Sequence, residues 1–338
     1  MSKRYKVIVT DFITNTLAPE RSVLGDIADV VALNATDEKQ LVGKVEDAAA
    51  LMVYHSIFRL SGATIDRLSG CKVITRCGVG YDNVELAAAQ RRGIPVCNVP
   101  DYGTEEVADS AIGMMLTLTR GIHVLNSRLR DSREEWHYTH ASPLVRLRGR
   151  TLGIIGLGRI GSAVAVRGKA IGMRVLYYDP YTPDGYDKAL GVTRAETLDE
   201  LLVQSDVMTC HCPLTDETRH MVNAAAIAKL KRGSYLVNNA RGGVVDAAAI
   251  PDAIASGQLA GAGIDVLETE PPPPDHPLIA AWRDPDHPAH HRVIVNPHSA
   301  FYCEEGLTEM RIKGAQSCRR ALLGQPLRNV VNGVSVPK

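Results

Sequence analysis

The feature that most constrains the fold is a glycine pattern in the middle of the chain. An apolar run, Thr151–Gly156, leads directly into Gly156-Leu-Gly158-Arg-Ile-Gly161, which is followed by a helical pattern over Ser162–Ile171. A second apolar run, Arg174–Tyr178, then ends in Asp179, about 20 residues beyond the glycines. A strand, a glycine-rich turn, a helix, a second strand and an acidic residue in this order are typical of a dinucleotide-binding βαβ unit. We therefore predict a Rossmann domain.

Each residue of this fingerprint has a physical role. Gly156 permits the tight turn, Gly158 lets the backbone approach a pyrophosphate, and Gly161 lets the helix pack closely on the strand. The pyrophosphate is expected on the amides at the positive end of the helix. Asp179 is placed to bind the adenosine ribose hydroxyls and would repel a 2′-phosphate, and Pro180-Tyr-Thr182 supplies no cation to hold one. NAD is therefore the predicted cofactor.

The rest of the chain alternates short apolar runs with helical patterns, which predicts an α/β fold of parallel sheets covered by helices on both faces. The other predicted strands are Lys6–Thr10, Val30–Leu33, Ala49–Tyr54, Lys72–Thr75, Val96–Val99, Asp206–Cys210, Ser234–Asn239, Ala260–Asp265 and Arg292–Asn296.

Two long helical patterns define the domain organisation. One runs from Thr104 to about Arg130 and is expected to leave one domain and enter the other; the second covers about Glu304–Leu323. We predict two doubly wound domains. Residues 1–103 and 299–338 form one domain, and residues 104–298 form the NAD-binding Rossmann domain.

Charge and cysteine usage exclude several classes of protein. Lys plus Arg and Asp plus Glu both number 38, so the chain has no bulk attraction for nucleic acid or anionic membranes. The seven cysteines are scattered through apolar stretches, which indicates reduced, buried thiols rather than a disulfide framework. No stretch approaches the roughly 18 apolar residues of a membrane span. We expect a soluble, cytoplasmic protein.

Three predicted strands end in residues suited to catalysis. The strands Ser234–Asn239 and Ala260–Asp265 are followed by Arg241 and Glu270, and His298 follows the next strand. In open α/β sheets, ligands lie beyond the carboxyl ends of the strands. A histidine can give and take a proton near neutral pH, a carboxylate can orient its imidazole, and an arginine can grip a substrate carboxylate. These residue types together predict hydride transfer between a nicotinamide and the 2-carbon of a 2-hydroxy or 2-keto acid.

The motifs together resemble the D-isomer-specific 2-hydroxyacid dehydrogenases, from about Ala49 to Gly333. Segments that carry the resemblance are Arg76-Cys-Gly-Val-Gly80-Tyr-Asp-Asn83, Val99-Pro-Asp-Tyr-Gly-Thr104-Glu-Glu-Val-Ala-Asp109 and Cys212-Pro-Leu-Thr-Asp-Glu-Thr218. The resemblance implies that residues 1–103 and 299–338 form a flavodoxin-like substrate domain. It also implies that Arg241, Glu270 and His298 are the catalytic residues. It implies that the three glycines, Asp179, Arg241 and His298 contact the cofactor. The other cofactor contacts that it implies are Thr104, Arg159, Ile160, Cys212, Pro213, Thr218, Asn239, Ala240, Asp265 and Ala300. It also implies substrate contacts from Tyr54, His55, Arg76, Val79, Gly80, Arg241, His298 and Phe301.

Within the family, the chain most resembles the C-terminal-binding-protein branch. The segments Tyr54-His-Ser-Ile57, Val96-Cys-Asn-Val-Pro100 and Tyr178-Asp-Pro-Tyr-Thr-Pro-Asp-Gly185 carry this likeness. That branch typically has Trp where this chain has Phe301, and the loop Pro272–His291 is expanded. Glu270 fits hydroxyacid oxidation, because formate-oxidising members use Gln there. Two alternatives stay open: an NAD(H)-sensing, co-repressor-like scaffold, and an oxyanion dehydrogenase that oxidises phosphite.

Three further expectations follow. Cys210-His-Cys212 has poor spacing for zinc, so we interpret its thiols as core residues and expect no metal site. The resemblance, with Trp136, implies a homodimer formed through the helices and arm between Thr104 and Arg150. Only five residues follow Gly333, so we expect no C-terminal regulatory domain.

Overall fold

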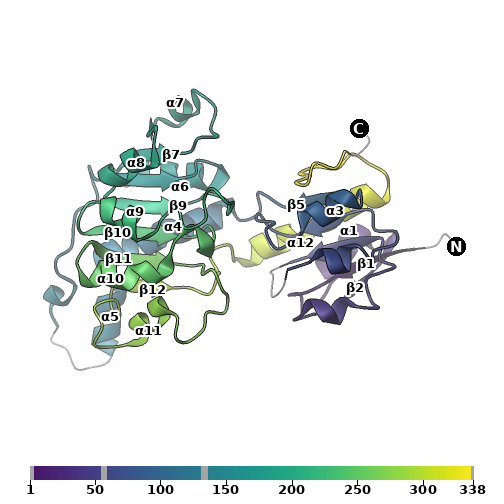
Figure 1. The fold of residues 1–338 in the computed structure, drawn as a ribbon, viewed down its shortest axis with the longest axis horizontal. Coiled ribbons are helices and arrows are strands. Elements are labelled where there is room, and N and C mark those ends of the chain that lie inside the picture. The colour runs from purple at the N-terminus through teal and green to yellow at the C-terminus, as the bar shows by residue number, and fades with distance from the viewer. Residues whose placement is uncertain (1–3, 55–58, 131–135, 336–338) are drawn as a thin grey trace. The chain divides into compact units, whose positions relative to one another are not determined.

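The computed structural model describes residues 4–54, 59–130 and 136–335, and the chain packs as two compact units (Figure 1). Unit 1 combines Met1–Gly103 with Tyr302–Lys338, and unit 2 is Thr104–Phe301. Residues 299–301 stay with unit 2 because the amides of Ser299 and Ala300 donate hydrogen bonds to Asp265. None of the helices in the described residues is long and apolar enough to cross a bilayer.

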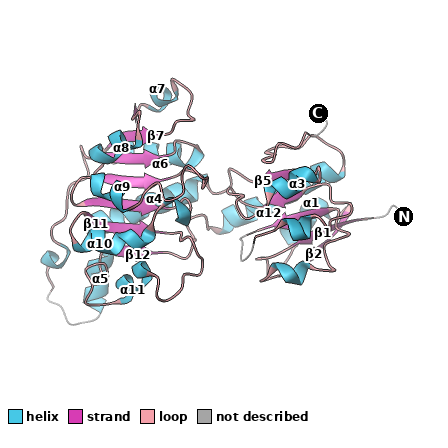
Figure 2. Ribbon diagram, in the orientation of Figure 1, coloured by secondary structure: helices cyan, strands magenta, loops and turns pink. Residues whose placement is uncertain are grey.

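Unit 1 contains a five-stranded parallel sheet in the order β2-β1-β3-β4-β5. Figure 2 draws the strands of both units in magenta and the helices in cyan. The strands of unit 1 are β1 (Tyr5–Val9), β2 (Ala28–Ala32), β3 (Ala50–Val53), β4 (Ile74–Arg76) and β5 (Val96–Asn98). Its α-helices are α1 (Ala18–Leu24), α2 (Gly62–Ile65), α3 (Leu86–Arg91) and α12 (Glu304–Leu322). This strand order is that of flavodoxin-like, doubly wound sheets. Helices α1 and α12 pack on each other, and α12 also packs on β3 and β4.

Unit 2 contains a seven-stranded parallel sheet in the order β12-β11-β10-β9-β6-β7-β8. Its strands are β6 (Thr151–Ile155), β7 (Arg174–Tyr178), β8 (Thr193–Arg194), β9 (Val207–Cys210), β10 (Ser234–Asn238), β11 (Leu259–Ile264) and β12 (Val293–Val295). Its α-helices are α4 (Thr104–Arg120), α5 (Ile122–Arg130), α6 (Arg159–Ala170), α7 (Tyr186–Leu190), α8 (Leu198–Gln204), α9 (Ala224–Lys229), α10 (Ile250–Ala255) and α11 (Pro277–Arg283). The chain order reverses between β6 and β9, as in Rossmann domains. The predicted pair of doubly wound domains is confirmed.

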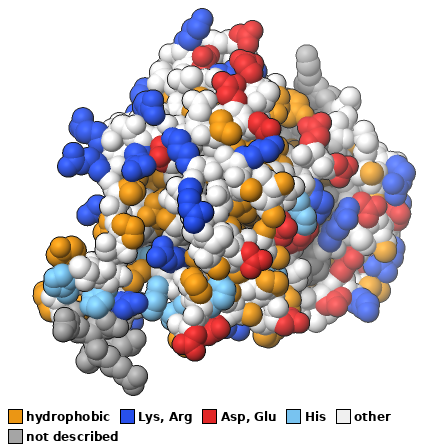
Figure 3. Space-filling model, turned by 60° about the vertical axis from the view of Figure 1, so that its left-hand side comes forward, with side chains coloured by type: hydrophobic (Ala, Val, Ile, Leu, Met, Phe, Trp, Pro, Cys, Tyr) orange, Lys and Arg blue, Asp and Glu red, His pale blue; other side chains and the backbone are white. Residues whose placement is uncertain are grey.

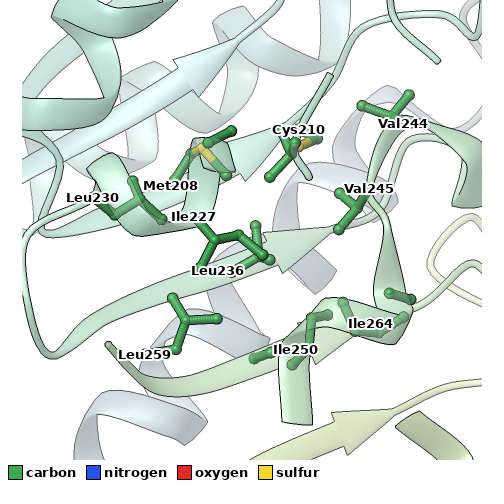
Figure 4. Packing of buried hydrophobic residues seen from close by; sticks show 14 of the residues in the cluster. Met208, Cys210, Ile227, Leu230, Leu236, Val244, Val245, Ile250, Leu259 and Ile264 are labelled. Carbon is green, nitrogen blue, oxygen red and sulfur yellow. The ribbon is translucent and has the colours of Figure 1, made fainter. Parts of the chain in front are cut away.

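The core of unit 2 follows from alternation along its buried strands. In β10, Leu236 belongs to a cluster shared with α8, α9 and α10, whereas Tyr235 and Val237 face α4 and α6. Figure 4 shows the first cluster, in which Met208 and Cys210 of β9 lie with Leu236. Successive side chains of a strand point to opposite faces, so a strand buried on both faces is apolar throughout.

Two details differ from the sequence predictions. The expected helix over residues 104–130 is divided into α4 and α5 by Gly121, whose φ of 63° ends α4. The short edge strand β8 was not predicted, because two residues carry no periodic signal. All seven cysteines lie in the described residues, and none of them forms a disulfide there; basic and acidic side chains both occur on the face drawn in Figure 3.

Candidate active site

The glycine-rich turn joins β6 to α6 in a conformation that requires glycine. Gly156 has a φ of 89°, and a Cβ placed on it would lie 2.8 Å from the amide nitrogen of Cys212. A Cβ on Gly161 would lie 2.0 Å from the carbonyl oxygen of Gly156, which any larger residue would displace. The turn therefore holds strand, helix and the loop after β9 together at the point where the strand order reverses.

Space for a ligand opens at the start of α6. Gly158 is the N-cap of the helix, no side chain caps it, and a Cβ built there meets no atom within 4 Å. The first amides of a helix are unsatisfied donors at the positive end of its dipole. This open cradle, with Arg159 and Ile160 in the first turn, fits the pyrophosphate of a dinucleotide.

Asp179 is tied to the glycine-rich turn. One carboxylate oxygen accepts a hydrogen bond from the amide of Leu157 at 2.9 Å, and the other accepts from the amide of Tyr181 at 2.9 Å. Each oxygen keeps a further lone pair, so the half-buried carboxylate can still bind ribose hydroxyls. Sequence reasoning missed the Leu157 contact because it involves only backbone of that residue.

The loop after β9 is shaped by its own side chains. Thr218 Oγ1 donates to the carbonyl of Pro213 at 2.8 Å and accepts from the amide of Thr215 at 2.8 Å. Burial raises the pKa of Cys212 to about 11 and lowers the pKa of His211 to about 3, so these groups are a neutral thiol and a neutral imidazole. In the described residues, no group of three or more His, Cys, Asp or Glu is arranged to hold a metal.

The carboxyl ends of β10, β11 and β12 lie side by side. Asn238 of β10 pairs with Ile264 of β11, which pairs with Val295 of β12. The loop after β10 contacts the loop after β11, since a Cβ on Gly242 would lie 1.9 Å from the carbonyl carbon of Leu267. Three neighbouring strand ends thus deliver the residues predicted to be catalytic to one edge of the sheet.

His298 and Glu270 form a close pair at this edge. His298 Nδ1 lies 2.7 Å from Glu270 Oε2, and the amide of Leu267 donates to Glu270 Oε1 at 2.8 Å. The side chains are 23% and 35% exposed, so the pair is supported by protein yet reachable from solvent. An ionised carboxylate only accepts hydrogen bonds, so Nδ1 carries the hydrogen and Nε2 is left to exchange a proton. The Phe301 ring lies edge-on to the imidazole at a centroid distance of 6.4 Å.

Asp265 binds the backbone of the segment that contains His298. It is 2% exposed and accepts hydrogen bonds from the amides of Ser299 and Ala300, while its carbonyl accepts from the amide of His298 at 2.7 Å. Burial raises the pKa of Asp265, and the two amide hydrogen bonds oppose that rise.

Asn239 and Arg241 follow β10 at this edge of the sheet. Arg241 Nη1 donates to the carbonyl of Ala240 at 2.9 Å. Asn239 is 7% exposed, and its Oδ1 is buried with no hydrogen-bond partner among the described residues. A buried oxygen without a donor fits a site that a ligand completes. Thr104 is the half-buried first residue of α4.

The substrate contacts implied for unit 1 have different surroundings. Arg76 is 7% exposed; its Nη1 donates to the carbonyl of Cys77 at 3.0 Å, within the loop that contains the half-buried Val79 and Gly80. Tyr54 is fully buried, and its hydroxyl donates to Glu20 at 2.9 Å. The Tyr54 ring is thus part of the core of unit 1 in this structure. His55 lies outside the described residues.

Comparison with known proteins agrees with this geometry. Residues 112–300 match the family described as "D-isomer specific 2-hydroxyacid dehydrogenase, NAD binding domain". The chain is 34% identical over 98% of its length to D-3-phosphoglycerate dehydrogenase of Methanocaldococcus jannaschii, and 33% identical over 94% to C-terminal-binding protein 1 of Caenorhabditis elegans. It spans 60% and 44% of the lengths of these two relatives.

A solved structure covers both units. It is the NADPH-dependent glyoxylate/hydroxypyruvate reductase of Sinorhizobium meliloti in complex with NADP and malonate, with a TM-score of 0.84, 30% identity and 99% of each chain covered. The strand orders and the glycine-rich turn define a protein with a Rossmann-type dinucleotide-binding domain and a flavodoxin-like domain. The chain belongs to the family of D-isomer-specific 2-hydroxyacid dehydrogenases.

Proposed function

We propose that the protein is an NAD-dependent oxidoreductase that interconverts a D-2-hydroxy acid and its 2-keto acid. The observation that carries this proposal is the 2.7 Å contact between His298 and Glu270, at the same carboxyl edge of the sheet as the glycine-rich turn. Unit 2 is then the NAD-binding domain and unit 1 the substrate domain.

In this reaction, different residues of the chain have different roles. When bound, the nicotinamide accepts a hydride from the 2-carbon or supplies one to it. His298 Nε2 takes the hydroxyl proton during oxidation and returns it to the carbonyl oxygen during reduction. Glu270 holds the imidazole through Nδ1 and stabilises its charged form. Arg241 binds the substrate carboxylate through its planar fork.

The same proposal assigns the remaining contacts. The amides of the loop that contains Val79 and Gly80, together with Arg76, bind the substrate carboxylate, and Phe301 forms an apolar wall beside His298. Thr104, Asn239, Ala240 and Asp265 would hold the nicotinamide end of the cofactor. The loop from Cys212 through Pro213 to Thr218 would hold the adenosine end, and the backbone of Ala300 would add a further cofactor contact.

We expect Asp179 to determine the preference for NAD. Asp179→Asn and Asp179→Ser remove the charge that disfavours a 2′-phosphate, so the ratio of kcat/KM for NAD to that for NADP should fall by about fivefold or more. The asparagine keeps an oxygen that can accept a hydrogen bond from the amides of Leu157 and Tyr181. Comparing the two variants therefore distinguishes the effect of the lost charge from the effect of a disrupted loop. Equal use of both cofactors by the wild type would contradict the assignment.

Steady-state assays test the activity itself. NADH oxidation would be followed with a panel of 2-keto acids, including glyoxylate and hydroxypyruvate, and NADH formation with D-2-hydroxy acids and with phosphite. Turnover with a keto acid is the expected result. Turnover with phosphite alone would favour the oxyanion dehydrogenase, and NADH binding without any turnover would favour the scaffold.

We also propose a cytoplasmic homodimer. Seven free cysteines fit a reducing compartment. Large apolar side chains are exposed on α5 and beyond it: Ile122 is 55% exposed, Tyr138 75% and Trp136 88%. Such residues are enriched at interfaces. Light scattering at micromolar concentration should give twice the 36.5 kDa mass of one chain, and Trp136→Ala should shift the equilibrium towards monomer. A wild-type monomer would contradict this proposal.

A further inference from the structure

A side-chain contact joins the loops that follow β7 and β9. The hydroxyl of Tyr181, two residues beyond Asp179, donates a hydrogen bond to the carboxylate of Glu217. Tyr181 is 76% exposed, so burial does not force this contact. The two loops flank the point between β6 and β9 where the strand order reverses, which is where a dinucleotide lies in this fold.

Tyr181 and Glu217 are each held in place by further hydrogen bonds in their own loops. The amide of Tyr181 donates to Asp179 Oδ1 at 2.9 Å, so the tyrosine is attached directly to the predicted ribose-binding carboxylate. Glu217 lies in the turn that Thr215 and Thr218 close, where the Thr218 amide donates to Thr215 Oγ1 at 3.3 Å. Asp179, Tyr181 and Glu217 therefore form a connected series, in which Tyr181 fixes the position of Glu217 relative to Asp179.

Two cations near these loops are paired with other acids. Arg219 Nη1 lies 2.6 Å from Glu268, and Arg194, which donates to the carbonyl of Thr182, lies 3.3 Å from Asp184. The contact with Glu217 also raises the pKa of Tyr181, and the charge of Asp179 adds to that rise, so the tyrosine remains a neutral donor. The adenosine end of the site is thus negative at two positions.

We propose that Glu217, held by Tyr181, is a second specificity-determining carboxylate that acts with Asp179 to exclude a 2′-phosphate. This inference rests on the proposed NAD-dependent function. A 2′-phosphate on a ribose bound at Asp179 would add its negative charge to a region that already holds the carboxylates of Asp179 and Glu217. Two like charges that cannot move apart disfavour the phosphate more than one does, and the effect weakens with salt.

Binding measurements on the purified full chain test the proposal without reference to turnover. Dissociation constants for NADH and NADPH would be measured by calorimetry at low and high salt. Glu217→Gln keeps an acceptor for Tyr181 and removes the charge, so NADPH should bind about five- to tenfold more tightly at low salt. NADH binding should stay within about twofold, and the NADPH gain should shrink at high salt.

Two variants serve as controls. Asp216→Asn removes the same charge from the adjacent, exposed position and should change the NADPH/NADH ratio far less. Tyr181→Phe keeps the charge but releases Glu217, so it should give a smaller NADPH gain than Glu217→Gln. An unchanged ratio in Glu217→Gln, or an equal change in Asp216→Asn, would overturn the inference. Failure of the wild type to bind either nucleotide would instead overturn the proposed function.

Discussion

Replacing His298 with alanine is expected to lower kcat by about 10²–10⁴ in both directions while the dissociation constant of NADH stays within about twofold. The reason is that Nε2 of this imidazole is the atom left to exchange a proton once Nδ1 is engaged by Glu270 at 2.7 Å. Stopped-flow and steady-state rates, together with fluorescence titration of NADH, would separate loss of chemistry from loss of binding.

The chain offers a matched control for this variant. His220 also pairs with a carboxylate, Glu268 at 2.8 Å, and also has a positive φ, 48° against 52° for His298. His220→Ala should therefore share any general cost of losing such a pair, yet leave kcat near the wild-type value. An ordinary kcat in His298→Ala would show that another group carries the proton.

Disrupting the buried ion pair of unit 1 should give the second large effect. Arg311 of α12 makes two hydrogen bonds of 2.7 Å to Glu20 of α1, and their side chains are 4% and 0% exposed. Glu20→Gln would leave the guanidinium buried without a counter-charge, which costs about 3–5 kcal/mol of unfolding free energy. The Tyr54 hydroxyl donates to the same carboxylate, so its hydrogen bond would also weaken.

Urea denaturation would measure this change. The control is Asp26→Asn, which weakens the exposed pair between Arg319 and Asp26 on the same two helical regions and should leave the midpoint nearly unchanged. Glu20→Met with Arg311→Met should recover much of the lost stability, because no buried charge remains. A Glu20→Gln midpoint equal to that of wild type would show that water or another group satisfies Arg311.

The sequence alone determined the elements whose signals are local. The run from Thr151 to Gly161 specifies strand, turn and helix in consecutive residues, and the turn conformation at Gly156 admits no larger side chain. The alternation of apolar runs with helical patterns likewise predicted two doubly wound sheets. Arg241, Glu270 and His298 were predicted to lie together because each comes after one of three neighbouring strands, and parallel strands bring their carboxyl ends to one edge.

Only the tertiary structure decided the contacts between residues distant in sequence. The resemblance suggested a substrate contact for Tyr54, whereas its ring is buried and its hydroxyl is bound by Glu20. No periodicity relates Tyr181 to Glu217 or Glu20 to Arg311, since their proximity depends on how loops and helices pack after the sheets form. Local sequence patterns report backbone preference and burial, whereas the pairing of polar side chains depends on the completed packing of the chain.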